Sequence, residues 1–167
     1  MISAVSSPAI LTATHEVDEF KSGEETLDSW LRERAMANME SAASRTYVIC
    51  PAGTPQVIGY YAVCMGQVLN QEVTGAMRRN IPRQIPAVIL GRLAVDHRWT
   101  GTGLGGALLR DAVERSVRAS REISARLMIV HAISLEAEAF YRHHGFIHLP
   151  SIQGATYAFD LAKYGQS

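Results

Sequence analysis

Residues 88–106 read Val-Ile-Leu-Gly-Arg-Leu-Ala-Val-Asp-His-Arg-Trp-Thr-Gly-Thr-Gly-Leu-Gly-Gly. An apolar run typical of a buried strand leads directly into a glycine-rich turn, and an amphipathic helical pattern follows the turn. A strand, a tight turn and a helix start in this order bring several backbone N–H groups to one place, where the helix dipole adds about half an elementary positive charge. The stretch therefore predicts a main-chain binding site for a phosphate or pyrophosphate group.

The residues on both sides of this stretch predict helices and strands in alternation. The order predicts an α/β fold, with a mixed central sheet flanked by helices in three layers (α-β-α). No repeat, low-complexity tract or long linker interrupts the chain, so we expect a single domain over residues 1–167. The expected helices are 24–40, 103–120 and 134–144, and the expected strands are 10–14, 47–50, 57–68, 88–95, 126–131, 146–149 and 156–161, with an irregular segment over 70–86.

The composition is that of a globular protein without a membrane segment. Apolar residues make up 47% of the chain and charged residues 19%. No basic cluster followed by an apolar core opens the chain, and no apolar run approaches the ~20 residues that a membrane span needs. Cys50 and Cys64 are the only cysteines and lack the short spacing of a metal site. We therefore expect a cytoplasmic protein with reduced cysteines, no metal and no membrane contact.

The net charge of zero conceals an uneven distribution of charge along the chain. Residues 1–40 carry −5, residues 41–130 carry +6 and residues 131–167 carry −1. Arginine outnumbers lysine fourteen to two, and a guanidinium binds phosphate with two parallel hydrogen bonds and stacks on bases. An RNA partner is therefore compatible with this chain, provided that the basic surface is local.

The glycine turn Gly101–Gly106 is open to more than one interpretation. It contains the G-x-G-x-x-G pattern of dinucleotide-binding folds, but those folds need an acidic residue at the end of the next strand, and here that strand ends in His131. Too little chain remains for a full doubly wound sheet, and the absence of a following Gly-Lys-Ser/Thr excludes a Walker loop. The remaining alternatives are a phosphate cradle and a plain turn in which the glycines only supply positive φ.

Two motifs resemble the signatures of the GNAT family of N-acetyltransferases. Arg98-x-x-Gly101-x-Gly103 is similar to the Q/R-x-x-G-x-G/A signature, with the strand and helix in the family's order, and Ala139-Phe140-Tyr141-x-x-x-Gly145-Phe146 is similar to the second signature. The resemblance covers most of the chain. It implies a GNAT-like sheet and acetyl-CoA as the co-substrate.

A longer run resembles the TacT-type toxins of bacterial type II toxin–antitoxin pairs. It comprises Ser22–Leu31, Ala43–Tyr47, Gly59–Tyr61 and Gly91–Asp96. The resemblance implies acetylation of the α-amino group of aminoacyl-tRNA, which blocks translation in the bacterial cytoplasm. It also implies a homodimer and a ribbon-helix-helix antitoxin, with operator DNA bound only through the complex with that antitoxin.

The GNAT resemblance assigns candidate coenzyme contacts. Leu93 and Val95 would offer backbone groups to the pantetheine arm and the thioester carbonyl, and Arg98 would add positive charge beside the pyrophosphate. Ser134 stands where many relatives carry Asn or Asp, although serine can still cap the helix that follows. The full set of candidate coenzyme-binding residues is Leu93, Ala94, Val95, Arg98, Gly101, Thr102, Gly103, Leu104, Gly105, Gly106, Ser134 and Phe140.

The resemblance implies direct attack of an amine on the acetyl thioester, with Tyr141 as the general acid for the departing thiolate. A tyrosine pKa of about 10 lies above a thiol pKa of about 8.5, so hydrogen bonding by Tyr141 could matter as much as proton donation. No general base is evident, because the strand 88–95 holds no carboxylate or histidine and only Asp96 and His97 follow it. An α-amino group, with a pKa of about 7.7–8.0, needs less help than a lysine, which favours an aminoacyl ester as the acceptor.

Four arginines are candidates for contacting RNA: Arg78, Arg79 and Arg83 in the irregular segment, and Arg92 near the expected reaction centre. A solvated face, or a docking site for an acidic antitoxin tail, is the alternative for this group. His143 and His144 would point about 100° apart on a helix and are not expected to chelate one metal ion.

Two other function classes remain open. An ordinary GNAT enzyme acting on a small amine or a protein N-terminus would be favoured by an acidic substrate pocket, and the arginine-rich middle of the chain argues against it. A non-catalytic binding module or co-repressor would not need Tyr141 together with an intact glycine turn.

Overall fold

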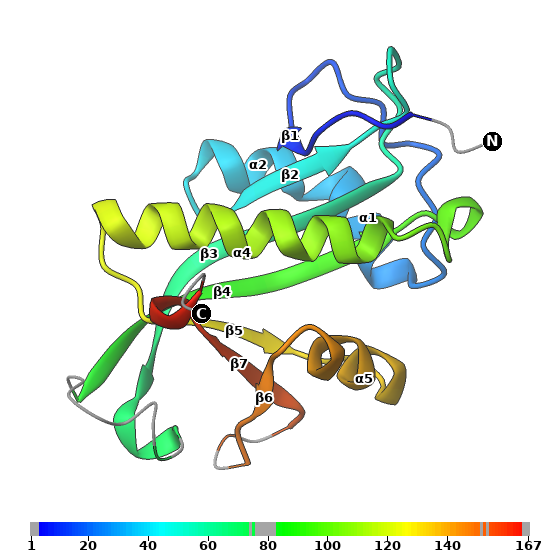
Figure 1. Cartoon of the computed structure of the whole chain (residues 1–167). Helices are drawn as coiled ribbons and strands as arrows, with labels where there is room; N and C mark the ends of the chain where they lie inside the picture. Colours follow the sequence, from blue (N-terminus) through cyan, green and yellow to red (C-terminus); the bar gives the residue numbers. More distant parts are fainter. Residues whose placement is uncertain (1–3, 74, 76–82, 151, 153, 165–167) are drawn as a thin grey trace. The chain divides into compact units, whose positions relative to one another are not determined.

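The computed structural model describes residues 4–73, 75, 83–150, 152 and 154–164 (Figure 1). The chain divides into two compact units, each of which is described by itself. The first consists of Met1–Cys64 and Gly91–Ala112, and the second of Met65–Leu90 and Val113–Ser167.

The first unit is built on antiparallel strands. It contains β1 (Ala9–Ile10), α1 (Glu25–Glu33), α2 (Ala35–Glu40), β2 (Arg45–Ile49), the first part of β3 (Gly59–Leu69), the last part of β4 (Gln84–Val95) and the first part of α4 (Leu104–Glu122). β1 pairs with β2, and β2 pairs with β3 from Arg45↔Val63 to Ile49↔Gly59. The turn between β2 and β3 contains Gly53 at φ 78°, which favours glycine.

Helices cover both faces of the strands in the first unit. Side chains alternate along a strand, and Val48 and Tyr60 pack in one core cluster with residues of α1. Their neighbours Ile49 and Gly59 face α4, where a Cβ atom at Gly59 would lie 2.9 Å from Leu108 Cδ1. The close approach of α4 to β3 therefore depends on glycine at this position. Within this unit the strands lie between α1 and α4, as the three-layer prediction requires.

The second unit mixes parallel and antiparallel pairing. It contains the ends of β3 and α4, the start of β4, β5 (Leu127–His131), α5 (Leu135–His143), β6 (Ile147–His148) and β7 (Thr156–Asp160). β5 runs parallel to β4, from Ala87↔Leu127 to Leu90↔Val130, and β7 is antiparallel to both β5 and β6. The seven strands hydrogen-bond in the order β1-β2-β3-β4-β5-β7-β6, a mixed sheet as predicted.

Three of the expected elements differ from the structure by more than shifts of one or two residues at their ends. The helix predicted over 24–40 is divided at Arg34, where φ is −122°, and the strand predicted over 10–14 is limited to Ala9–Ile10. β4 begins at Gln84, four residues before the predicted start at residue 88. Pro86 suggested an irregular segment, yet Ile85 and Ala87 on either side of it are fully buried, as the alternation of a strand requires. No helix in the described ranges is both long and apolar enough to cross a bilayer.

Candidate functional site

The candidate site of the first unit lies where β4 ends and α4 begins. The chain leaves β4 through a 3₁₀ turn, η2 (His97–Trp99), enters the glycine turn and starts α4 at Leu104. Gly101 and Gly103 have φ of 75° and 88°, in the left-handed region that other residues rarely adopt. A Cβ atom at either glycine would meet no atom of the chain within 4 Å, so both glycines adjoin open space.

The backbone N–H groups of this turn are unpaired. Those of Gly101–Gly106 donate to no residue that the structure describes, and the N–H of Ala107 is the first to find an acceptor, Gly103 O at 3.1 Å. The first turn of α4 carries no acidic side chain. The Thr102 hydroxyl donates a hydrogen bond to Trp99 O, which stabilises the turn. Unpaired N–H groups beside open space at a helix start are the geometry of an anion cradle, and they fit the phosphate site expected from the sequence.

The last residues of β4 extend beyond its pairing with β5. That pairing ends at Leu90, so Gly91–Val95 continue without a β5 partner among the described residues. Leu93 and Val95 are only half-buried although both are apolar residues of an interior strand. The Ala94 side chain is 5% exposed and packs in the α1 core cluster, so only its backbone is available to a ligand. This stretch can therefore offer main-chain groups and an apolar surface.

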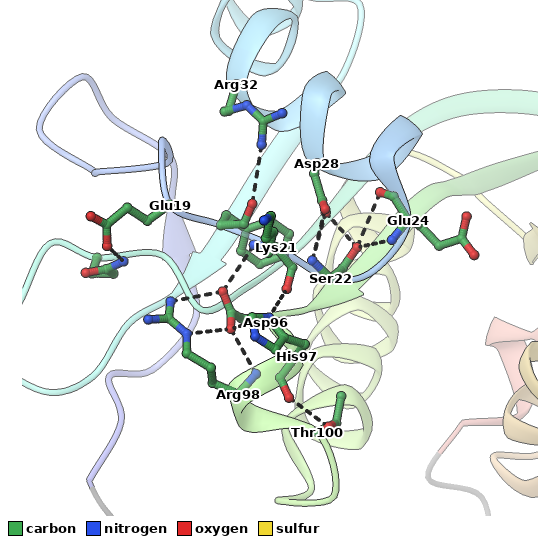
Figure 2. Close-up of polar contacts among 12 residues, drawn as sticks. Glu19, Lys21, Ser22, Glu24, Asp28, Arg32, Asp96, His97, Arg98 and Thr100 are labelled. Carbon is green, nitrogen blue, oxygen red and sulfur yellow. Dashed lines mark hydrogen bonds and ion pairs between the residues drawn. The ribbon is translucent and has the colours of Figure 1, made fainter.

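Asp96 joins the end of β4 to the loop before α1 (Figure 2). The buried Asp96 carboxylate accepts hydrogen bonds from Arg98 Nε at 2.9 Å, from Arg98 Nη2 at 3.1 Å and from the backbone N–H of Arg98 at 3.0 Å. It also accepts one from Lys21 N at 3.1 Å. Burial acts to raise the pKa of Asp96, but the hydrogen bonds from Arg98 and Lys21 outweigh it, so the pKa lies below its ordinary value. The Arg98 guanidinium, expected beside the pyrophosphate, is thus engaged with Asp96.

We expect Asp96→Asn to lower the free energy of unfolding at pH 7 by about 2–3 kcal/mol, because an amide cannot accept the same set of charge-assisted hydrogen bonds. The Tm should fall by about 4–12 °C for a chain of this size. Because the folded-state pKa is lowered, this stabilisation is present above the unfolded pKa of about 3.9 and is lost as the pH falls through the folded value.

Urea unfolding at pH 7 and at about pH 2 measures this difference. The exposed Asp18 provides the control, because Asp18→Asn makes the same chemical change without buried partners. A loss of stability that is equal at the two pH values would contradict the role given to the Asp96 carboxylate.

The loop before α1 is fixed by further polar contacts (Figure 2). Ser22 donates to the buried Asp28 carboxylate through its N–H at 3.0 Å and its hydroxyl at 2.6 Å. The carbonyl of Lys21 accepts from His97 N at 2.7 Å. A cavity of about 280 Å³ beside these contacts is lined by Lys21, Gly23, Glu25, Asp28 and His97. No sequence pattern indicated this cavity, because its lining comes from segments some 70 residues apart in the chain.

The arginines expected to contact RNA are distributed over both units. Arg92 lies on β4 in the first unit, and its guanidinium Cζ is 4.6 Å from the centroid of the Trp30 indole. Arg83 lies in the second unit, just before β4, and is exposed. Arg83 and Arg92 thus belong to different units, and Arg78 and Arg79 lie outside the described residues.

Tyr141 lies on α5, in the second unit. It is 7% exposed, and its ring packs against those of Phe140 and Phe146, with centroids 5.2 Å and 5.5 Å away. Burial raises the pKa of Tyr141 to about 12. Its hydroxyl has no hydrogen-bond partner among the described residues, although most tyrosine hydroxyls in such surroundings have one. The group is therefore neutral and available to an external acceptor.

Two other expected residues flank Tyr141. Ser134 caps α5, as predicted, because its hydroxyl accepts from Ala137 N at 3.0 Å. Phe140 is half-buried, and its carbonyl lies 2.9 Å from His144 Nδ1. No group of three or more His, Cys, Asp or Glu residues in the described ranges could hold a metal ion. The cradle and Tyr141 thus belong to different units, and each is described within its own unit.

Comparison with known proteins identifies the family. Residues 55–148 match the model of the acetyltransferase (GNAT) domain. The chain is 43% identical over 145 residues to a tRNA-acetylating toxin of Mycobacterium tuberculosis (strain ATCC 25618 / H37Rv), covering 87% of this chain and 86% of the relative.

Solved structures agree with this result. The fold matches AtaT complexed with acetyl-methionyl-tRNAfMet with a TM-score of 0.90 and 28% identity, over 96% of both chains. It also matches a mutant AtaT toxin bound to the C-terminus of the antitoxin AtaR and acetyl-CoA, with a TM-score of 0.82 and 29% identity, over 95% of this chain and 94% of the other. These findings confirm the resemblance inferred from the two signatures. The chain belongs to the GNAT family of acetyltransferases and is similar to tRNA-acetylating toxins.

Proposed function

We propose that this protein transfers an acetyl group from acetyl-CoA to the α-amino group of an aminoacyl-tRNA, and that it acts as the toxin of a type II toxin–antitoxin pair by blocking translation. The observation that carries the proposal is the 43% identity to a tRNA-acetylating toxin over 87% of the chain. The unpaired N–H groups of the glycine turn support the coenzyme part of the proposal.

The residues of the first unit fit a coenzyme that carries a pyrophosphate. The N–H groups of Gly101–Gly106 would bind the phosphate oxygens, with the start of α4 supplying positive potential. The backbone of Leu93 and Val95 would hold the pantetheine arm and polarise the thioester carbonyl, as an oxyanion hole does. Acetyl-CoA supplies the acetyl group as a thioester, which an amine attacks directly.

Tyr141 would hold a proton on its hydroxyl and donate a hydrogen bond to the departing sulfur. Its raised pKa, about 12, keeps the proton on the phenol at neutral pH. Full transfer of that proton to a thiolate with a pKa of about 8.5 is uphill, so stabilisation by hydrogen bonding is the larger part of its role. An aminoacyl ester amine is already largely neutral near pH 8, so the lack of a carboxylate or histidine on β4 is no obstacle.

Several further features belong to the same proposal. Arg83 and Arg92 would contact the RNA, together with Arg78 and Arg79. The partner would be a ribbon-helix-helix antitoxin, with operator DNA bound through their complex, and the toxin would be a homodimer in the bacterial cytoplasm, where charged tRNA is found. A single domain over residues 1–167 agrees with the continuity of β3, β4 and α4, each of which runs from one unit into the other.

The direct test is incubation of the protein with labelled acetyl-CoA and one of three acceptors: bulk aminoacylated tRNA, deacylated tRNA or free amino acids. We expect label on the charged tRNA alone, and digestion then identifies the acetylated amino acid. Label on free amino acids or on proteins would instead favour a GNAT enzyme with a small amine or a protein N-terminus as its acceptor. No label on any RNA, from a protein that still binds acetyl-CoA, would refute the proposal.

A further inference from the structure

The Arg92 guanidinium of β4 lies over the indole ring of Trp30 of α1 in the first unit. The Arg92 Cζ atom lies 4.6 Å from the centroid of the Trp30 indole, a geometry that favours a cation–π interaction. Trp30 in turn stacks on Tyr60, with ring centroids 6.1 Å apart and planes inclined by 10°. Tyr60 is fully buried, and its hydroxyl donates to Leu27 O at 2.6 Å. The buried Tyr60 ring therefore fixes the position of the Trp30 indole, and the indole in turn fixes the position of the Arg92 guanidinium.

Arg92 differs from three other arginines of this fold in its charge partners. Arg32, Arg98 and Arg126 each form an ion pair with a carboxylate at 2.8–3.0 Å. Arg92 is half-buried and forms no ion pair with any carboxylate in the described part of the chain. The guanidinium N–H groups of Arg92 form no hydrogen bond with any described residue, and guanidinium N–H groups match the oxygens of a phosphate. The pair is thus suited to an anion from outside the chain.

The position of Arg92 on β4 identifies which anion it would meet. Arg92 and Ala94 share the face of β4 that packs toward α1, and the residue between them is Leu93. The proposed function assigns the thioester to the backbone of Leu93. In an aminoacyl-tRNA the carboxyl group of the amino acid is esterified to the ribose of the 3′-terminal nucleotide and the α-amine is free to react. The 5′ phosphate of that nucleotide is therefore the anion nearest to the amine.

The geometry points to a role for both residues in substrate recognition: Arg92 binds the phosphodiester of the 3′-terminal nucleotide, and Trp30 is the positioning residue that orients its guanidinium. This inference rests on the proposed function and adds a chemical group of the acceptor that the protein recognises. This role accounts for the position of Trp30, which lies on α1, is only partly buried and contacts the Arg92 guanidinium of β4. For an acceptor that lacks this phosphate, Arg92 and Trp30 should contribute nothing to binding.

Two acceptors that differ in phosphate provide the test. One is an aminoacyl-adenosine without a phosphate, and the other is the aminoacylated trinucleotide CCA, which has phosphodiesters. We expect Arg92→Gln to lower kcat/KM for the trinucleotide by about 10-fold, mainly through KM, because a charge-assisted bidentate contact is lost. The value for aminoacyl-adenosine should stay within about twofold of wild type.

Further variants separate orientation from charge. Arg92→Lys keeps the charge but not the planar edge, so it should behave more like Arg92→Gln than like wild type. Trp30→Leu should lower kcat/KM for the trinucleotide alone, and Trp30→Phe should restore most of it. The control is Arg110→Gln, which removes an exposed arginine of α4 and should change neither value.

A binding measurement makes the inference testable without catalysis. For deacylated tRNA, the slope of log K against log salt concentration should become shallower by about 0.7 in Arg92→Gln, the value for one lost contact to single-stranded phosphate. An unchanged slope, or an equal loss of activity on both acceptors, would overturn the inference. If the wild-type protein acetylates none of the three acceptors (charged tRNA, the aminoacylated trinucleotide and aminoacyl-adenosine), the proposed function itself is overturned.

Discussion

Tyr141→Phe is expected to lower the rate of acetyl transfer to charged tRNA by about 10²–10³-fold, within the range found for loss of a general acid. The variant removes a hydroxyl that has no hydrogen-bond partner among the described residues, while the ring keeps its contacts with Phe140 and Phe146. We therefore expect the fold and the affinity for acetyl-CoA to remain close to those of wild type. Induced expression of the variant should no longer arrest growth.

The measurement is a single-turnover time course with saturating acetyl-CoA, which separates the acetyl-transfer step from product release. Tyr164→Phe is the matched control, because it removes a hydroxyl that donates to Glu114 in the same unit and has no assigned part in the reaction. Its rate should stay within about twofold of wild type. Full toxicity and a full rate in Tyr141→Phe would refute the role given to Tyr141.

The environment of Tyr141 decides how its hydroxyl acts. With the pKa raised to about 12 by burial, the phenol stays neutral near neutral pH. A neutral phenol donates a hydrogen bond and does not act as a base. The pH dependence of transfer near neutrality should therefore follow ionisation of the acceptor amine, whose pKa is about 7.7–8.0 or lower in an ester.

The strand, turn and helix over residues 88–106 could be predicted because each depends on local chemistry. An apolar run, two glycines at positive φ and an amphipathic helix need no information from elsewhere in the chain. The same holds for Ser134 as the cap of α5. The early start of β4 was missed because Pro86 is a strong local signal, whereas the burial that keeps Pro86 in a strand comes from distant neighbours.

The contacts that build the site from distant residues could not be predicted from the sequence. Lys21 and Asp96 are 75 residues apart, and only the fold brings the Lys21 N–H to the Asp96 carboxylate. The hydrogen bonds from the Arg98 guanidinium to the Asp96 carboxylate show the same limit, because the GNAT resemblance, which assigned Arg98 a place beside the pyrophosphate, did not indicate them. Trp30 falls within the helix predicted over residues 24–40, but that prediction did not indicate the Arg92 guanidinium over its indole ring.

Gly101→Ala is expected to weaken acetyl-CoA binding by about 10–100-fold, the equivalent of one lost charge-assisted hydrogen bond of about 1.5–3 kcal/mol. Two effects act together at this position. A Cβ atom at residue 101 would enter the open space that the phosphate is proposed to occupy, and alanine disfavours the φ of 75° that aims the neighbouring N–H groups. Because the backbone N–H groups of the turn form no hydrogen bond in the described chain, the hydrogen bond from the Thr102 hydroxyl to Trp99 O is what would hold the turn once the glycine is lost.

The chain contains a control that separates these two effects. Gly53, in the turn between β2 and β3, has φ 78°, and a Cβ atom there would also meet no atom within 4 Å, so Gly53→Ala carries the same backbone cost at a site without a phosphate. Both variants should lose about 1 kcal/mol of unfolding free energy, but only Gly101→Ala should lose affinity for acetyl-CoA in calorimetric titration. Equal affinities in the two variants would mean that the glycines serve the turn alone, and the pyrophosphate would then have to be bound elsewhere on the chain.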